Sequence, residues 1–134
     1  SKLAQIAPAY FETKIIKEIP PEAFYPEPRV DSAVIKIKPI YKKDIKNKKL
    51  LFLRYILDRT NFITKNAIRD SLIQYSEESL GNRLTKKQAK QMIKDHGFSE
   101  KLLNKPIVTL SSEDIAKITN FYEFSVNKLS KSTN

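Results

Sequence analysis

The chain has 134 residues, of which 40% are hydrophobic and 30% are charged, and its formal net charge is +10. This composition is typical of a folded domain with its own core and excludes a disordered tail. Because it has no cysteine and one histidine, the sequence excludes disulfides, a thiolate nucleophile and cysteine or histidine metal clusters. No apolar run approaches the ~20 residues of a membrane span, and no secretion signal opens the chain. We therefore expect a cytoplasmic protein without a metal or a membrane partner.

The positive charge is concentrated in the second part of the sequence. Residues 1–39 contain six Lys or Arg against five Asp or Glu, whereas residues 40–134 contain nineteen against ten. A local excess of this size favours a polyanionic partner, which in a cytoplasmic protein means RNA or DNA before anionic lipid. From the charge alone, a surface that only keeps the protein soluble is an equally good explanation.

The first elements in chain order are a helix end and two strands. Residues 2–10 have helical spacing, and Pro8 indicates that a helix ends there. Residues 13–19 and 32–38 have strand patterns, and a short helical turn is expected between them. The two strands should pair antiparallel. Because a two-stranded ribbon is marginally stable alone, we expect it to complete a larger sheet.

An aromatic arm connects these strands. Pro26 and Pro28 each fix their own φ and keep the preceding residue out of the helical region, so residues 25–28 are predicted to run extended. Phe24 would then stand on a rigid arm. On residue type alone, an aromatic side chain at such a position is more often a core residue than a ligand contact.

The sequence after residue 39 is predicted to be helical. Residues 40–49 form a lysine-dense connector that indicates a domain boundary. Residues 50–57 are apolar except for Arg54, as expected of a helix buried on most of its circumference. Helical spacing over 63–75, with Lys65 and Arg69 one turn apart, predicts a basic amphipathic helix.

Two further helices are marked by their caps. Thr85 and Gln88 have the spacing of a capping box, and Gly97 suits a left-handed cap at the other end of that helix. His96, in the last turn, is interpreted as a helix-end residue. Ser111 is expected to cap the last helix, and residues 130–134 are expected to be a frayed polar tail.

Together these patterns predict an α+β chain in two parts. Residues 1–39 would be a helix end plus a β-hairpin, and residues 40–134 a mostly helical, basic domain. The candidate RNA contacts are the basic residues of the connector and of the helices that follow: Lys42, Lys43, Lys46, Lys49, Arg59, Lys65, Arg69, Lys86, Lys87 and Lys90. For any single one of them, a solvated surface role remains an equal alternative.

The arm and the strand after it carry a family resemblance. Residues 24–32 resemble the F-x-P-x-P-x-V-x-S motif of adenine-N6 methyltransferases that act on ribosomal RNA. Val30-Asp31-Ser32-Ala33-Val34 is most similar to the small-subunit rRNA adenine dimethyltransferases, the KsgA family. Large-subunit rRNA methyltransferases and a mitochondrial transcription factor branch share the core of the motif. The resemblance implies that Phe24 stacks on the flipped target adenine, with Pro26 and Pro28 positioning the arm.

The resemblance continues more weakly along the chain. Arg69-Asp70-Ser71-Leu72 is similar to an R-N-x-L-like segment of the family, and residues 110–116 are similar to its last helix start. Members of the family usually have a dense Arg/Lys run before the R-N-x-L-like segment. Here residues 60–63 stand in that place without a basic side chain, which leaves Arg59, Lys65 and Arg69.

The matching stretches correspond to the C-terminal half of the family. Its S-adenosylmethionine site needs a glycine-rich turn, whereas this chain has two glycines, Gly81 and Gly97. The resemblance therefore implies the end of a Rossmann-like methyltransferase domain and a helical domain, from an S-adenosylmethionine-dependent rRNA adenine-N6,N6-dimethyltransferase. We expect the chain to be inactive alone, with the cofactor bound by residues outside it.

The implied partners are small-subunit rRNA and the pre-ribosomal particle. Three alternatives stay open: a large-subunit rRNA adenine methyltransferase relative, a stand-alone RNA-binding or ribosome-assembly module, and a helical protein-interaction domain.

Overall fold

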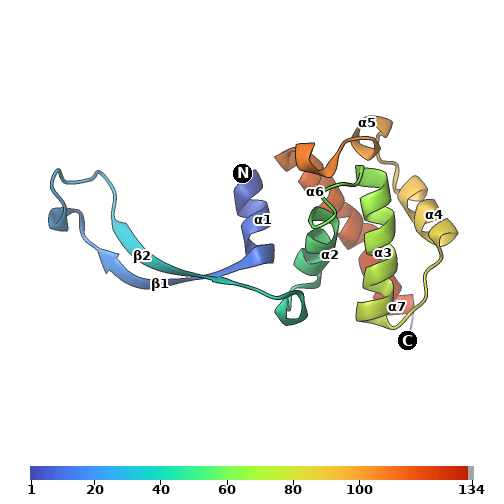
Figure 1. Ribbon diagram of the computed structural model, residues 1–134, viewed down its shortest axis with the longest axis horizontal. Helices are drawn as coiled ribbons and strands as arrows, with labels where there is room; N and C mark the ends of the chain where they lie inside the picture. The colour runs from blue at the N-terminus through green and yellow to red at the C-terminus, as the bar shows by residue number, and fades with distance from the viewer. Residues whose placement is uncertain (133–134) are drawn as a thin grey trace.

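A computed structural model describes residues 1–132, with side chains described as far as residue 129. A long β-hairpin projects from a bundle of helices, and the first helix lies where the two meet (Figure 1). The first part comprises α1 (Lys2–Tyr10), β1 (Phe11–Ile19), η1 (Pro21–Ala23) and β2 (Ser32–Pro39). The helical bundle comprises η2 (Lys42–Asp44), α2 (Lys48–Leu57), α3 (Thr64–Leu80), α4 (Lys86–His96), α5 (Glu100–Leu103), η3 (Ile107–Thr109), α6 (Ser112–Phe121), η4 (Tyr122–Val126) and α7 (Asn127–Ser132). The predicted α+β fold is confirmed.

The hairpin has one apolar and one charged face. β1 and β2 pair antiparallel, and directly opposed residues share a face. The pairs Ile15↔Ile35 and Thr13↔Ile37 form the apolar face, whereas Lys14↔Lys36 lies on the other. A register shift between Ile15 and Lys17 adds a residue to β1 there. The alternation seen in the sequence therefore produces an amphipathic ribbon.

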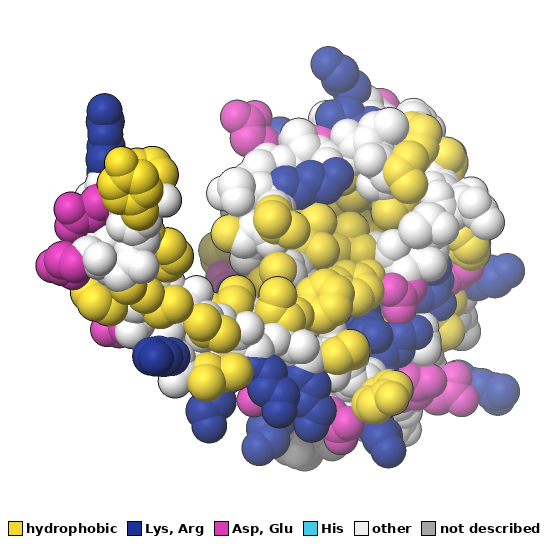
Figure 2. All heavy atoms as spheres, turned by 60° about the vertical axis from the view of Figure 1, so that its left-hand side comes forward, with side chains coloured by type: hydrophobic (Ala, Val, Ile, Leu, Met, Phe, Trp, Pro, Cys, Tyr) yellow, Lys and Arg dark blue, Asp and Glu magenta, His cyan; other side chains and the backbone are white. Residues whose placement is uncertain are grey.

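The apolar face of the hairpin is largely uncovered. Ile15, Ile35 and Ile37 keep 59%, 49% and 57% of their surface exposed. Figure 2 shows hydrophobic side chains running along the hairpin and facing the hollow between it and the helical bundle. A row of exposed aliphatic side chains is typical of a surface that another element covers. This agrees with the expectation that the ribbon completes a larger sheet.

The arm between the strands is not uniformly extended. The backbone bends over residues 24–26, and the Tyr25–Pro26 peptide bond is cis. The predicted extended course over 25–28 is therefore wrong at its start. The prediction rested on the fixed φ of each proline, which constrains single residues but not the course of the whole segment.

Aromatic rings form the centre of the helical bundle. Phe52 of α2 is 1% exposed, and its ring lies 5.9 Å from Tyr75 of α3 and 5.7 Å from Tyr122 of η4. Phe121 is fully buried on another side of Phe52, with ring centroids 6.4 Å apart. The Tyr75 and Tyr122 hydroxyls lie 2.9 Å apart and satisfy each other by a hydrogen bond. The predicted core helix over 50–57 is thus confirmed.

The helix caps read from the sequence are also present. Thr85 and Gln88 form both hydrogen bonds of a capping box at the start of α4, and Gly97 ends that helix with φ +83°. Ser111 forms a second capping box with Asp114 at the start of α6. The segment predicted as a polar tail is helical up to Ser132, and its last two residues lie outside the described part.

Helix α1 packs on the helical bundle. Ala9 is fully buried, and the Gln5 amide both donates to the Ser112 carbonyl, at 3.1 Å, and accepts from the Ser112 hydroxyl, at 2.9 Å. These contacts join α1 to α6, although the two helices are far apart in sequence. The domain boundary predicted after residue 39 remains a prediction.

Arg54 joins three segments where the hairpin meets the bundle. It extends from α2, its side chain is 16% exposed, and its Nη1 donates to the carbonyl oxygens of Ala9 and Ile40. Its guanidinium lies over the Tyr10 ring, 4.8 Å from the centroid. Asp58, one turn later, accepts a 2.6 Å hydrogen bond from the Tyr10 hydroxyl. We call Arg54, Asp58 and Tyr10 the clasp, because they fix the end of α1 and the exit of β2 to α2.

None of the helices in the described part is both long and apolar enough to cross a membrane.

Candidate RNA interface

Phe24 caps η1 in the connection between β1 and β2. This connection lies at the far end of the hairpin from the helical bundle (Figure 1). The Phe24 side chain is 41% exposed, and the neighbouring Tyr25 is fully exposed. Its backbone N–H donates to the Pro21 carbonyl at 3.2 Å, so the short turn η1 fixes where the arm begins. In this chain Phe24 is therefore no core residue, and its ring is accessible. Stacking on an adenine stays a prediction.

Some lysines of the connector, residues 40–49, form ion pairs and others do not. Lys42 forms a 3.0 Å ion pair with Asp58 of the clasp, and Lys49 forms a 2.9 Å ion pair with Glu123. Lys43 and Lys46 are exposed and make no ion pair within the described part of the chain. Exposed ion pairs are weak, so Lys42 and Lys49 can exchange their partners for a phosphate at small cost.

Arg59 has a structural role that the sequence did not indicate. Its guanidinium donates to the Tyr55 carbonyl at 2.8 Å, to the Ser71 hydroxyl at 3.3 Å and to Gln74 Oε1 at 3.0 Å. These bonds connect α2 with α3 and use most of the donors of the fork. Arg59 is accordingly a poorer candidate for RNA contact than its position after the apolar run implied.

Lys86 and Lys87 lie in the first turn of α4 and are both exposed. Lys86 lines a shallow depression together with Asp70, Glu77 and Glu78. The nearby carboxylates lower the positive potential around Lys86. Lys87 does not line that depression.

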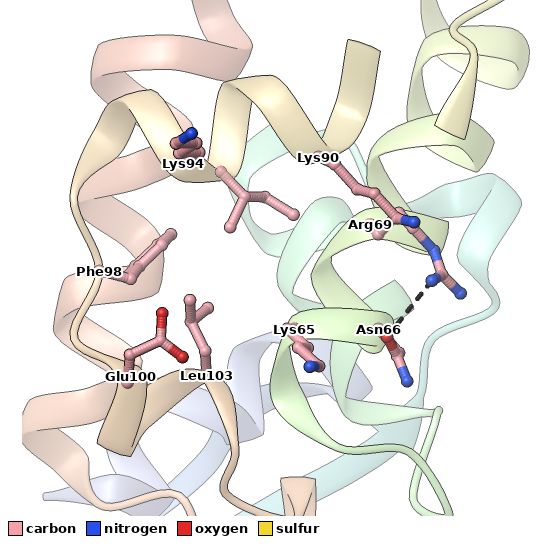
Figure 3. A pocket seen from close by; sticks show the side chains of 9 residues that line it. Lys65, Asn66, Arg69, Lys90, Lys94, Phe98, Glu100 and Leu103 are labelled. Atoms are coloured by element: carbon pink, nitrogen blue, oxygen red, sulfur yellow. Dashed lines mark hydrogen bonds between the residues drawn. The ribbon is translucent and has the colours of Figure 1, made fainter. Parts of the chain in front are cut away.

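Lys65, Arg69 and Lys90 are brought together by the packing of α3 against α4. They line an open pocket of ≈370 Å³, to which Lys94 also contributes (Figure 3). Lys94 is not among the RNA contacts predicted from the sequence. Its position one turn after Lys90 was the available signal.

Burial and hydrogen bonding set the ionisation of two groups near these surfaces. Burial and then the hydrogen bond to Asp58 raise the pKa of Tyr10 well above its usual value, so the clasp hydroxyl remains a donor. Burial lowers the pKa of His96, the last residue of α4. His96 packs on Phe98 and Phe121, with ring centroids 4.6 Å and 5.1 Å away, which supports its interpretation as a helix-end residue.

That S-adenosylmethionine is bound by residues outside this chain stays a prediction. A Rossmann-like site needs glycines where the backbone approaches the cofactor. Here Gly81, with φ +68°, ends α3, and Gly97 ends α4, so both glycines are helix caps. Within residues 1–132, no three His, Asp or Glu side chains gather as metal ligands do.

Comparison with protein families assigns the chain to a class of RNA-modifying proteins. A family described as "Ribosomal RNA adenine dimethylase" matches residues 1–123. The chain belongs to this family. The resemblance of the arm motif is thereby confirmed.

Curated relatives agree over a shorter stretch. The chain is 43% identical over 44 residues to "Ribosomal RNA small subunit methyltransferase A" of Francisella tularensis subsp. novicida strain U112. The proteins of that name from subsp. tularensis strain WY96-3418 and subsp. holarctica strain LVS match to the same degree. Each alignment covers 33% of this chain and 17% of the relative.

Proposed function

We propose that the chain is the C-terminal part of an S-adenosylmethionine-dependent adenine-N6,N6-dimethyltransferase that acts on small-subunit rRNA during ribosome assembly. In this proposal residues 1–39 end the catalytic domain and residues 40–134 form a basic RNA-binding domain. The cofactor is held by residues outside this chain, because the glycines present serve as helix caps.

The observation that carries the proposal is the hairpin together with its exposed aromatic arm. The apolar face with Ile15, Ile35 and Ile37 has the character of a surface that packs in a larger protein. If the hairpin pairs with the edge of the catalytic sheet, other elements of that domain would cover this face. Phe24, in the connection at the end of the hairpin, would then lie at an end of the strands, which is where ligands bind in open α/β sheets. A flipped adenine loses its stacking neighbours, and an aromatic side chain recovers part of that energy.

The helical bundle supplies the RNA contacts in this proposal. The lysines of the connector and the cations between α3 and α4 carry charge that phosphates would neutralise. The clasp holds the hairpin to α2, so RNA bound on the bundle has a defined position relative to the arm.

The decisive experiment is methylation of small-subunit rRNA by the full-length protein with radiolabelled S-adenosylmethionine. We expect two methyl groups on each modified adenine, detected by nucleoside mass spectrometry. Transfer to large-subunit rRNA instead would identify the large-subunit relative. Salt-dependent rRNA binding without methylation would identify an RNA-binding or ribosome-assembly module, and absence of both would favour a protein-interaction domain.

A second measurement tests the division of labour within the protein. Calorimetry of the 134-residue chain with S-adenosylmethionine should show no stoichiometric binding, whereas the full-length protein should bind it. Stoichiometric binding by the chain alone would contradict the proposal.

A further inference from the structure

The pocket between α3 and α4 has a ring of cations. Lys65 and Arg69 reach it from α3, and Lys90 and Lys94 reach it from α4 (Figure 3). The three lysines are exposed and make no ion pair within the described residues. Four like charges around one opening repel one another, and an anion bound there would relieve that repulsion.

The position of the Arg69 guanidinium at this opening is fixed. It forms a 2.8 Å ion pair with Asp70 and donates to Asn66 Oδ1 at 3.3 Å. Its side chain is 18% exposed. Arg69 therefore offers an ordered group at the edge of the pocket, whereas the lysines can adjust to a ligand.

The wall of the pocket is apolar. It is formed by Ile93, Phe98 and Leu103, and Ile93 is only 6% exposed. The Phe98 ring is held by contacts with His96 at 4.6 Å and with Phe121 at 5.2 Å between centroids. A free phosphate would leave this wall in water, and an apolar peptide would leave the cations unsatisfied. The pocket therefore suits a ligand that is anionic at one end and flat and apolar at the other.

We infer that this pocket binds one unpaired nucleotide of a single-stranded RNA segment, with its phosphate on the lysines and its base against Phe98 and Leu103. The inference rests on the proposed function, since it specifies how the RNA-binding domain holds its partner. A volume of ≈370 Å³ is enough for a single nucleotide. A base in a duplex stays stacked and paired, whereas an unpaired base can turn out of the strand and lie on an aromatic side chain.

The carboxylate of Glu100, which also lines the pocket, favours a base over a second phosphate as its ligand. Glu100 lies on the same side as Phe98 and Leu103, away from Arg69 (Figure 3). A carboxylate accepts hydrogen bonds from amino groups, which adenine, cytosine and guanine present at their edges. Glu100 therefore gives the pocket a hydrogen-bond acceptor for such a base. Its negative charge disfavours a ligand that is anionic along its whole length.

The test is an NMR titration of the isotope-labelled 134-residue chain. The probes are adenosine 5′-monophosphate, ribose 5-phosphate, adenosine, and uridine 5′-monophosphate as a nucleotide without an amino group. We expect the adenine nucleotide to shift amides of α3, α4 and residues 98–103, and to bind roughly tenfold more tightly than ribose 5-phosphate, because the base adds stacking. Adenosine should bind more weakly than adenosine 5′-monophosphate. The Glu100→Gln variant should show a smaller preference for adenosine 5′-monophosphate over uridine 5′-monophosphate.

A double substitution of Lys90 and Lys94 by Gln should weaken binding of a short unstructured oligoribonucleotide by roughly tenfold or more. The matched control replaces Lys87 and Lys101 by Gln, which removes the same charge from exposed positions outside the pocket and should have a much smaller effect. Phe98→Leu should reduce the advantage of the nucleotide over ribose 5-phosphate. If that variant unfolds, the comparison of probes on the unmodified chain still decides.

Three results would overturn the inference. One is equal affinity for ribose 5-phosphate and the nucleotide, which would mean a phosphate site only. Another is equal loss in the double variant and its control, which would mean diffuse charge. The third is tighter binding of a phosphoserine peptide than of the oligoribonucleotide. Retained salt-dependent binding of small-subunit rRNA in any of these cases would leave the proposed function standing, whereas its loss would count against both.

Discussion

The strands of the hairpin and the helices of the bundle have similar shares of hydrophobic residues. They differ in how far these residues are buried. In the bundle, Phe52 and Ile56 are buried to 1% and 0% exposure. In the hairpin, Ile16 and Ile35 remain 61% and 49% exposed. The bundle therefore buries its apolar side chains internally, whereas the apolar side chains of the hairpin stay accessible. This difference indicates that the helical bundle contributes most of the folding free energy of the chain.

Removing one apolar side chain from each region tests this difference most directly. Phe52→Ala should lower the free energy of unfolding by about 3–5 kcal/mol, because it leaves a cavity among Tyr75, Phe121 and Tyr122. Ile35→Ala should cost less than about 0.5 kcal/mol, as at other exposed positions. Urea unfolding of both variants measures the difference. Equal losses would show that the hairpin packs as firmly as the bundle.

The second prediction concerns the clasp that joins the two regions. Arg54→Met should lower the free energy of unfolding by about 2–4 kcal/mol, because the carbonyls of Ala9 and Ile40 lose a charged donor in a partly buried place. Lys48→Met is the matched control, since Lys48 is an exposed cation of the same helix. Chemical denaturation checks both variants. A loss no larger than that of the control would show that the clasp does not hold the hairpin to the bundle.

The third prediction uses the full-length protein and the arm. If Phe24 stacks on the target adenine, Phe24→Ala should slow single-turnover methylation by about one to two decades, since stacking is worth ~1–3 kcal/mol. Phe24→Tyr and Phe24→Trp should retain much more activity. Because a side chain that faces the substrate is not part of the core, the melting temperature should change little. A large fall in melting temperature with normal activity per folded molecule would remove Phe24 from the site.

The smallest expected effect is a pH dependence inside the bundle. Burial alone would raise the pKa of Asp114, but hydrogen bonds from Lys105 and Ser111 outweigh it and hold that pKa at about 2, below the usual 3.8. The stabilisation is therefore complete above pH ~4 and is lost as the pH falls towards 2. The effect should be about 1 kcal/mol, since Lys105 remains 28% exposed and water screens the pair.

Lys105→Met tests this assignment by urea unfolding at pH 7 and at pH 2.5. The variant should be less stable than the original chain at pH 7, and the gap should narrow at pH 2.5. A gap that does not change with pH would show that Lys105 contributes through packing.

Local chemistry allowed much of the secondary structure to be predicted. The capping box at Thr85, the cap at Ser111 and the glycine cap at Gly97 depend on residues within four positions of one another, so their spacing is visible in the sequence. The alternation that produced β2 is equally local. The motif around Phe24 pointed to the family for a different reason, because several residue types had to coincide at fixed spacing.

Contacts between segments far apart in sequence depend on the tertiary structure. Arg54 interrupts an apolar run and connects α1 and the end of the hairpin to α2. Arg59 follows the same run and connects α2 to α3. Lys65 and Lys90 are 25 positions apart and meet at one pocket only because α3 packs against α4. Hydrophobic periodicity indicates which face of a helix is buried but not which helix covers it. The sequence therefore predicts the elements and the family motif, whereas packing determines which charged side chains are held in structural contacts and which stay accessible at the surface.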